Sequence, residues 1–149
     1  MNVAVINGPN LNLLGVREPA VYGRESLRDV EDGLRIIAGD VGATLEFIQH
    51  NGEGQLIDAI HAMRGRIDGA IVNAGAYSHS SLAMRDALVG VSIPFVEVHV
   101  TNVYAREQER RHSMLASSAI GVVAGLGTYG YEMALRGLVA SLRARDASA

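Results

Sequence analysis

Short apolar runs alternate with segments of helical periodicity along the chain, and this alternation restricts the possible folds more than any other feature. Runs of this kind, bounded by turn residues, are typical of strands. Parallel strands need long crossover connections, and helices between the strands provide them. The expected strands are Val3–Ile6, Ala43–Ile48, Gly69–Val72, Ile93–Val100 and Ala119–Ala124.

The segments between these strands carry apolar residues at helical spacing. Ser26 and Asp29 form an approximate capping box at the start of the first helix. We therefore predict one domain over residues 1–149, an α/β flavodoxin-like three-layer sandwich with a five-stranded parallel sheet, and a frayed tail at Ala144–Ala149. The expected helices are marked by Leu27, Val30, Leu34 and Ile37, by Leu56, Ile60 and Met63 with an end near Gly65, by Ser81–Leu88, and by Tyr131, Leu135, Leu138 and Leu142.

Composition excludes several classes of function. No apolar run approaches the roughly 20 residues that cross a bilayer, and the first residues lack the basic start and cleavage site of a secretory signal. The sequence thus predicts a soluble, cytoplasmic protein without a membrane partner. A formal net charge of −3 gives no reason to expect nucleic acid, because phosphate binding requires clustered Lys and Arg.

The chain contains no cysteine and no lysine, so all 13 basic residues are arginines. A thiolate nucleophile, a thiolate metal site and a Schiff base on a lysine side chain are therefore impossible. The arginine guanidinium stays protonated and suits carboxylates and other anions. We therefore expect a small anionic ligand and no thiolate-bound metal.

Polar segments follow several of the expected strands. In open parallel sheets ligands bind beyond the carboxyl ends of the strands, so these segments are the candidate site. The connection from Asn7 to Gly23 is much longer than usual and is predicted to be a lid. Asn73–Ser81 and Glu97–Asn102 bring amides and two histidines to the same edge, and Arg106–Ser113 adds a basic cluster.

Several long motifs occur in order along the chain, namely GPNLNLLGVREPAVYG from Gly8, NAGAYSHSSLAMRDAL from Asn73, PFVEVHVTN from Pro94, REQERRHS from Arg106 and GLGTYGYEMAL from Gly125. With these motifs the chain resembles the type II 3-dehydroquinate dehydratases from end to end. The resemblance implies a flavodoxin-like fold, a dodecamer of four trimers, and cofactor-free dehydration of 3-dehydroquinate to 3-dehydroshikimate through an enolate, by trans elimination in the shikimate pathway.

The resemblance also implies the roles of individual residues. Tyr22 matches the base that removes the proton next to the ketone, and Arg17 matches the cation that favours its anion. Free tyrosine has a pKa of about 10, and one desolvated cation can supply the roughly 4 kcal/mol that the anion needs at neutral pH. Asn10 matches a residue that holds a water at the enolate. His99 matches the general acid, with Glu97 orienting its ring.

The resemblance further implies which residues bind the substrate. Asp86 matches a residue that reaches the site of a neighbouring subunit. Family members commonly have Ser at position 101 and Thr at positions 78 and 80, whereas this chain has Thr101, Ser78 and Ser80, so each hydroxyl is kept. The other implied binding residues are Asn73, His79, Val100, Thr101 and Arg110.

The residues alone leave other interpretations open. Without the motifs, Tyr22 is more typical of a surface aromatic, Arg17 and Glu18 of an exposed pair, and Arg110 of a solvated helix face. We assign the glycines from Gly125 to Gly130 to close helix packing. His50, His61 and His112 lack metal-like spacing and are assigned to structure or surface.

Other functions also remain compatible with the sequence. A catabolic quinate-pathway enzyme would use the same step. A different lyase or hydrolase, a protein that binds the substrate without turnover, and a non-catalytic flavodoxin-like binding module share the fold class.

Overall fold

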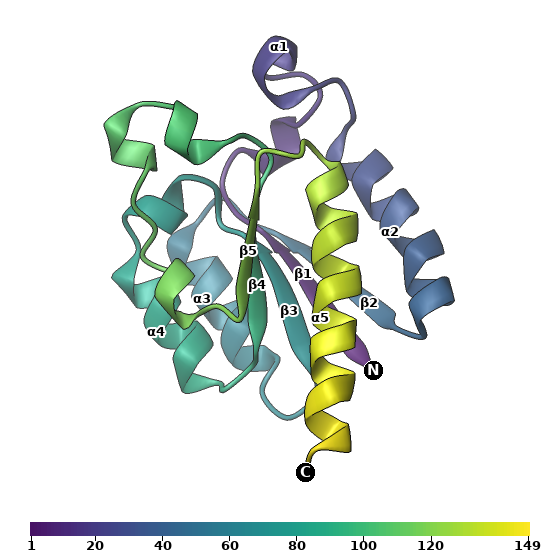
Figure 1. Cartoon of the computed structure of the whole chain (residues 1–149). Helices are drawn as coiled ribbons and strands as arrows, with labels where there is room; N and C mark the ends of the chain where they lie inside the picture. Colours follow the sequence, from purple (N-terminus) through teal and green to yellow (C-terminus); the bar gives the residue numbers. More distant parts are fainter.

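A single five-stranded parallel sheet with the order β2-β1-β3-β4-β5 forms the centre of the molecule. The computed structural model describes residues 1–149. The prediction of a flavodoxin-like α/β fold is confirmed (Figure 1). The strands are β1 (Asn2–Asn7), β2 (Thr44–Gln49), β3 (Gly69–Asn73), β4 (Phe95–His99) and β5 (Gly121–Ala124).

Helices cover both faces of the sheet and bury a separate core on each side. On one face, α2 (Leu27–Val41) and α5 (Tyr129–Ala147) contact each other, and on the other α3 (Glu53–Ala62) contacts α4 (Leu82–Gly90). Side chains alternate across β1, so that Val3 and Val5 join the first core while Ala4 and Ile6 join the second. Every residue of β3 is buried, as expected for a strand covered on both faces.

Most predicted boundaries agree with the structure within two residues. The capping box at the start of α2 is present, because Ser26 Oγ accepts from the amide of Asp29 while the Asp29 carboxylate accepts from the amide of Ser26. The strand predicted from Ile93 begins only at Phe95, because Pro94 has no N–H for the ladder. The prediction of a frayed tail from Ala144 is wrong, since α5 continues to Ala147.

The sequence predicts close helix packing for the glycine-rich turn before α5, and the structure gives these glycines a different role. Gly125 and Gly127 have φ values of +87° and +62°, a left-handed conformation that disfavours side chains. A Cβ at Gly130 would make only ordinary contacts, with Val123 Cγ1 at 3.4 Å and Val98 Cγ1 at 3.6 Å. Turn geometry thus explains Gly125 and Gly127, and the packing of α5 does not require a glycine at position 130.

The connections that follow the strands gather at one end of the sheet, where the first of them projects furthest (Figure 1). This predicted lid contains a 3₁₀ helix, Leu11–Leu13, and a short helix α1 (Pro19–Tyr22). A Cβ at Gly15 would lie 2.8 Å from the carbonyl oxygen of Arg24, so the middle of the loop packs closely against the backbone just after its end. No helix has the length and apolar character needed to cross a membrane.

A buried polar network joins α5 to two central strands beneath the loops. The Tyr131 hydroxyl donates to Asn7 Oδ1 at 2.6 Å and accepts from Asn73 Nδ2 at 2.8 Å. The Tyr131 side chain is fully buried, and this burial raises its pKa far above the ordinary value. The apolar stripe predicted the position of Tyr131 but gave no sign of these partners.

Replacing Tyr131 with Phe should lower the free energy of unfolding by about 1–3 kcal/mol, because polar groups of Asn7 and Asn73 lose their partner. Above about pH 10 a tyrosine in the unfolded chain ionises while buried Tyr131 keeps its proton, so stability falls as pH rises. Urea denaturation at pH 8 and pH 11 should show this fall in the wild type and a smaller fall in the variant. Replacing the exposed Tyr129 with Phe is the control, and an equal fall in all three proteins would contradict the assignment.

Candidate active site

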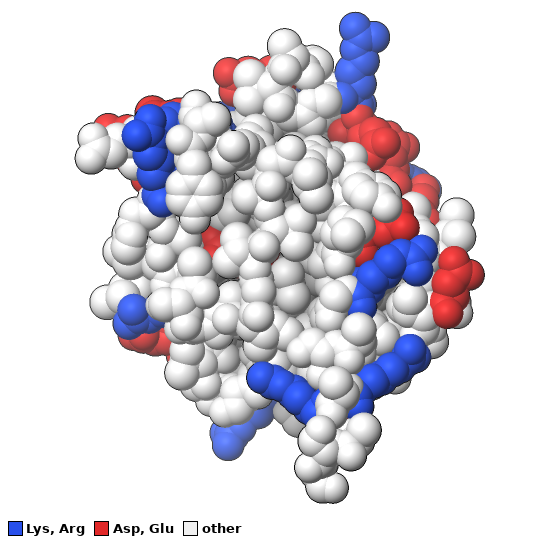
Figure 2. Space-filling view, viewed as in Figure 1, with Lys and Arg blue, Asp and Glu red and all other residues white.

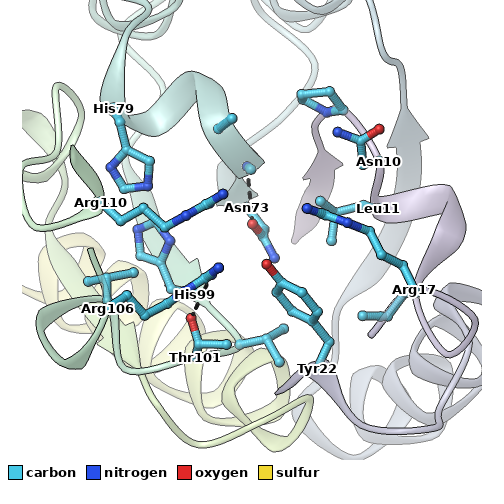
Figure 3. A pocket seen from close by; sticks show the side chains of 16 residues that line it. Asn10, Leu11, Arg17, Tyr22, Asn73, His79, His99, Thr101, Arg106 and Arg110 are labelled. Atoms are coloured by element: carbon cyan, nitrogen blue, oxygen red, sulfur yellow. Dashed lines mark hydrogen bonds between the residues drawn. The ribbon is translucent and has the colours of Figure 1, made fainter. Parts of the chain in front are cut away.

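A cleft that is partly open to solvent lies where the loops meet beyond the carboxyl ends of the strands, and its enclosed part has a volume of about 90 Å³. The lid contributes Asn10, Arg17 and Tyr22, and segments from Asn73 to Arg110 form the other wall. Figure 3 shows the side chains converging from these separate loops. Nine of the eleven predicted site residues line the cleft, namely Asn10, Arg17, Tyr22, Asn73, His79, His99, Val100, Thr101 and Arg110.

The Tyr22 phenol enters the cleft between two guanidinium groups (Figure 3). Arg17 Cζ lies 5.3 Å from the ring centroid and Arg106 Cζ lies 5.4 Å from it. Arg17 also lies 3.6 Å from the Glu18 carboxylate, the pair considered from the sequence. Both guanidinium groups thus lie within cation–π distance of the Tyr22 ring.

Asn10 is held in an unusual backbone conformation at the start of the lid. Its φ is +67°, in the left-handed region that asparagine tolerates better than most residues. The amide of Asn10 donates to Asn51 Oδ1 at 3.0 Å, and Gln49 Nε2 donates to the same oxygen at 3.1 Å. Loops after β1 and β2 are thus joined, which fixes Asn10 at the edge of the cleft.

His99 and Glu97 form a buried pair at the end of β4. His99 Nε2 lies 2.6 Å from Glu97 Oε1, and the Glu97 side chain is completely buried. Because a carboxylate only accepts, Nε2 carries a proton in this bond and Nδ1 is left free. Glu97 therefore does not line the cleft itself but lies behind His99.

His79 stacks against His99 with ring centroids 5.8 Å apart. Its Nδ1 donates to the backbone carbonyl of His112 at 2.8 Å, because a carbonyl oxygen only accepts. Burial lowers the pKa of His79, which favours its neutral form at physiological pH. Neutral His79 then has an unprotonated Nε2, which can accept a hydrogen bond from a ligand hydroxyl.

Asp86 is the predicted site residue that the structure does not bring to this cleft. It lies on α4 with a side chain 67% exposed, and its carboxylate is 3.3 Å from Arg85. It therefore does not line the cleft formed by its own chain.

Arg106 is a cleft residue that sequence reasoning did not single out within its basic cluster. Besides its place beside Tyr22, Arg106 Nη1 donates to Thr101 Oγ1 at 3.4 Å. Arg110 also faces the cleft and lies 2.5 Å from Glu107. Arg111 instead donates to the backbone carbonyl of Arg106 and does not line the cleft. The cleft thus presents three guanidinium groups, which suits an anionic ligand.

Comparison with known proteins identifies the family. The sequence pattern of the family described as "Dehydroquinase class II" matches residues 1–139 of the chain. The chain belongs to this family.

Individual class II dehydroquinase relatives cover nearly the whole chain. A protein named 3-dehydroquinate dehydratase from Gemmatimonas aurantiaca is 57% identical over 148 residues, covering 99% of this chain and 97% of its own. A catabolic 3-dehydroquinase from Aspergillus oryzae is 51% identical, with coverage of 99% and 97%. The crystal structure of type II dehydroquinase from Butyrivibrio crossotus has a TM-score of 0.89 and 40% identity, covering 91% of this chain and 95% of its own.

His, Asp and Glu side chains form no cluster of three or more that could hold a metal ion. In this class II dehydroquinase the titratable groups around the cleft occur instead as separate pairs, such as Glu97 with His99. The arrangement offers a phenol, an imidazole and fixed positive charge, which together suit proton transfer on an anionic substrate.

Proposed function

We propose that this chain removes water from 3-dehydroquinate to form 3-dehydroshikimate. The observation that supports this most directly is that one cleft holds a phenol between two guanidiniums and a carboxylate-bound imidazole. The group needed for a base thus comes from the lid, and the group needed for an acid comes from the end of β4. Family membership supports the same reaction.

In the proposed mechanism the Tyr22 phenolate removes the proton on the carbon next to the ketone. Arg17 and Arg106 favour the phenolate, since each guanidinium lies beside the ring. The resulting enolate needs hydrogen-bond donors, and Asn10 would hold a water there. His99 acts here as an imidazolium: it keeps its Nε2 proton toward Glu97 and gives its Nδ1 proton to the departing hydroxyl, which leaves as water while the carbon–carbon double bond forms.

The proposed binding residues suit a polyhydroxy carboxylate. Arg110 supplies a fixed positive charge, and His79 an acceptor for a hydroxyl. Asn73 faces the cleft with its amide held by Tyr131, and Val100 and Thr101 follow β4 directly. Residues 1–149 would act as one dehydroquinase domain, because all five strands belong to one sheet.

The proposal includes a dodecamer of four trimers in which Asp86 serves a neighbouring subunit. The Asp86 side chain is exposed and does not line the cleft of its own chain, which fits this role. Figure 2 shows a broad face with few charges over β5 and α5. These two elements and the turn between them carry the exposed apolar residues Val122, Leu126, Tyr129 and Met133. Light scattering should give about 190 kDa, twelve times 15.8 kDa. A monomer would contradict this part of the proposal.

Cytoplasmic location and a biosynthetic role in the shikimate pathway complete the proposal. Relatives carry both unqualified and catabolic names, and both roles use the same reaction. Deletion of the gene in the source organism should cause a requirement for aromatic amino acids. Loss of growth on quinate alone would instead assign the catabolic role.

The direct test is to incubate the purified protein with 3-dehydroquinate and follow the ultraviolet absorbance of the conjugated enone. We expect a steady rise that a chelator does not reduce. No rise would defeat the proposal, and a purified protein coloured by bound flavin would favour a flavodoxin-like binding module instead.

A further inference from the structure

The segment after β4 contains a hydroxyl that contacts the buried carboxylate behind His99. Ser113 Oγ lies 2.7 Å from Glu97 Oε1, the same oxygen that accepts from His99 Nε2. Ser113 does not line the cleft. Any effect of Ser113 on the reaction must therefore pass through Glu97 and His99.

The direction of each hydrogen bond at Ser113 follows from counting its protons and lone pairs. The hydroxyl oxygen accepts from the amides of Leu115 at 3.0 Å and Ala116 at 3.1 Å. A hydroxyl has two acceptor positions and one proton. Because both acceptor positions are used, the single proton of Ser113 is donated to Glu97.

The carboxylate of Glu97 depends on this donor for its orientation. Its side chain is completely buried, and no group of the protein donates to Oε2. Both hydrogen bonds therefore meet at Oε1, one from Ser113 and one from His99. A buried carboxylate without sufficient donors is strongly disfavoured, so the Ser113 hydroxyl both stabilises the charge and limits its rotation.

We propose that Ser113 is a positioning residue, whose hydroxyl holds the Glu97 carboxylate so that Glu97 keeps a proton on His99 Nε2 and leaves His99 Nδ1 for the reaction. This role rests on the proposed dehydration, in which His99 is the acid. Two backbone amides donate to Ser113 Oγ, so the backbone of this loop holds the hydroxyl that in turn holds Glu97.

The first test is kinetic and compares three substitutions. Ser113→Ala should lower kcat about tenfold or more, the order expected when a charged group loses a hydrogen bond, with KM changed less than about threefold. Ser113→Thr keeps the hydroxyl and should restore most of the rate. Ser117→Ala, at an exposed serine in the same segment, is the matched control and should behave as the wild type.

A double-mutant cycle separates positioning from a purely structural effect on the loop. In a Glu97→Gln background, Ser113→Ala should have little further effect on kcat, because its route to His99 has already been removed. An equal loss in both backgrounds would show that Ser113 acts by capping the loop, and would overturn the proposal.

A spectroscopic measurement tests the same contact without turnover. In protein labelled with ¹⁵N at histidine, the Nε2–H proton of His99 should give a downfield signal that shifts in Ser113→Ala and returns in Ser113→Thr. An unchanged signal, together with wild-type kcat in Ser113→Ala, would refute the role. An inactive wild type in which this signal still responds would instead refute the proposed reaction and leave the contact established.

Discussion

Tyr22→Phe should lower kcat for 3-dehydroquinate by about 10²-fold or more while leaving substrate binding nearly unchanged. The substitution removes only the phenol oxygen, which in the proposed mechanism accepts the proton from carbon. The aromatic ring remains between Arg17 and Arg106, so the shape of the cleft is preserved. The rate is followed by enone absorbance and binding by calorimetry.

Hydrogen exchange provides a more specific measurement for the same variant. When wild-type protein acts in D₂O, unreacted substrate should gain deuterium next to the ketone whenever the enolate returns. Tyr22→Phe should lose this exchange together with turnover. Tyr104→Phe is the control, since Tyr104 is 67% exposed and outside the cleft. A Tyr22→Phe protein that keeps more than a tenth of the wild-type rate would exclude Tyr22 as the base.

His99→Ala should also lower kcat by about 10²-fold or more, but it should slow the later step, in which the hydroxyl leaves. Without the imidazole, hydroxide must leave without a proton, and the buried Glu97 carboxylate loses one of its two donors. Tyr22 remains in place, so the enolate should still form and return.

The predicted signature of His99→Ala is therefore deuterium exchange without dehydration. Mass spectrometry of recovered substrate separates this outcome from the Tyr22→Phe result. If His99→Ala lost exchange and dehydration together, His99 would be needed for enolate formation, and the proposed division between base and acid would be wrong. His61→Ala, on α3 away from the cleft, controls for general effects of losing a histidine.

The sheet was predictable because burial on two faces leaves a simple signal in the sequence. The buried run at β3 and the helical spacing in α2 gave elements close to those observed. The predicted ends of strands were less accurate where a single residue decides them, as Pro94 does at the start of β4. The extension of α5 through its charged last turn had no apolar signal to reveal it.

Periodicity could not predict which side chains of the irregular loops point into the cleft. The basic cluster contains Arg106, Arg110 and Arg111, but only the first two line the cleft, because 3₁₀ turns at Val103–Ala105 and Gln108–Arg110 set their directions. The contact of Ser113 with Glu97 spans 16 residues and likewise has no local pattern.

The motifs nevertheless named most of the residues that line the cleft. Tyr22 and His99, which lie far apart in the sequence, are both among these residues. Strand geometry alone would have predicted only that polar residues after β3 and β4 meet at one edge. Exposed Asp86 shows the limit of a single chain, because its predicted place is in another subunit.

The stretch from Arg106 to Ser113 sends two guanidiniums into the cleft, supplies the carbonyl that fixes His79, and ends in the hydroxyl bound to Glu97. Surface loops usually tolerate insertions and deletions. Here a single added or removed residue would put several groups out of register at once, so the number of residues in this loop is itself constrained. Any redesign of substrate preference in this enzyme should therefore exchange side chains along the stretch and keep its length.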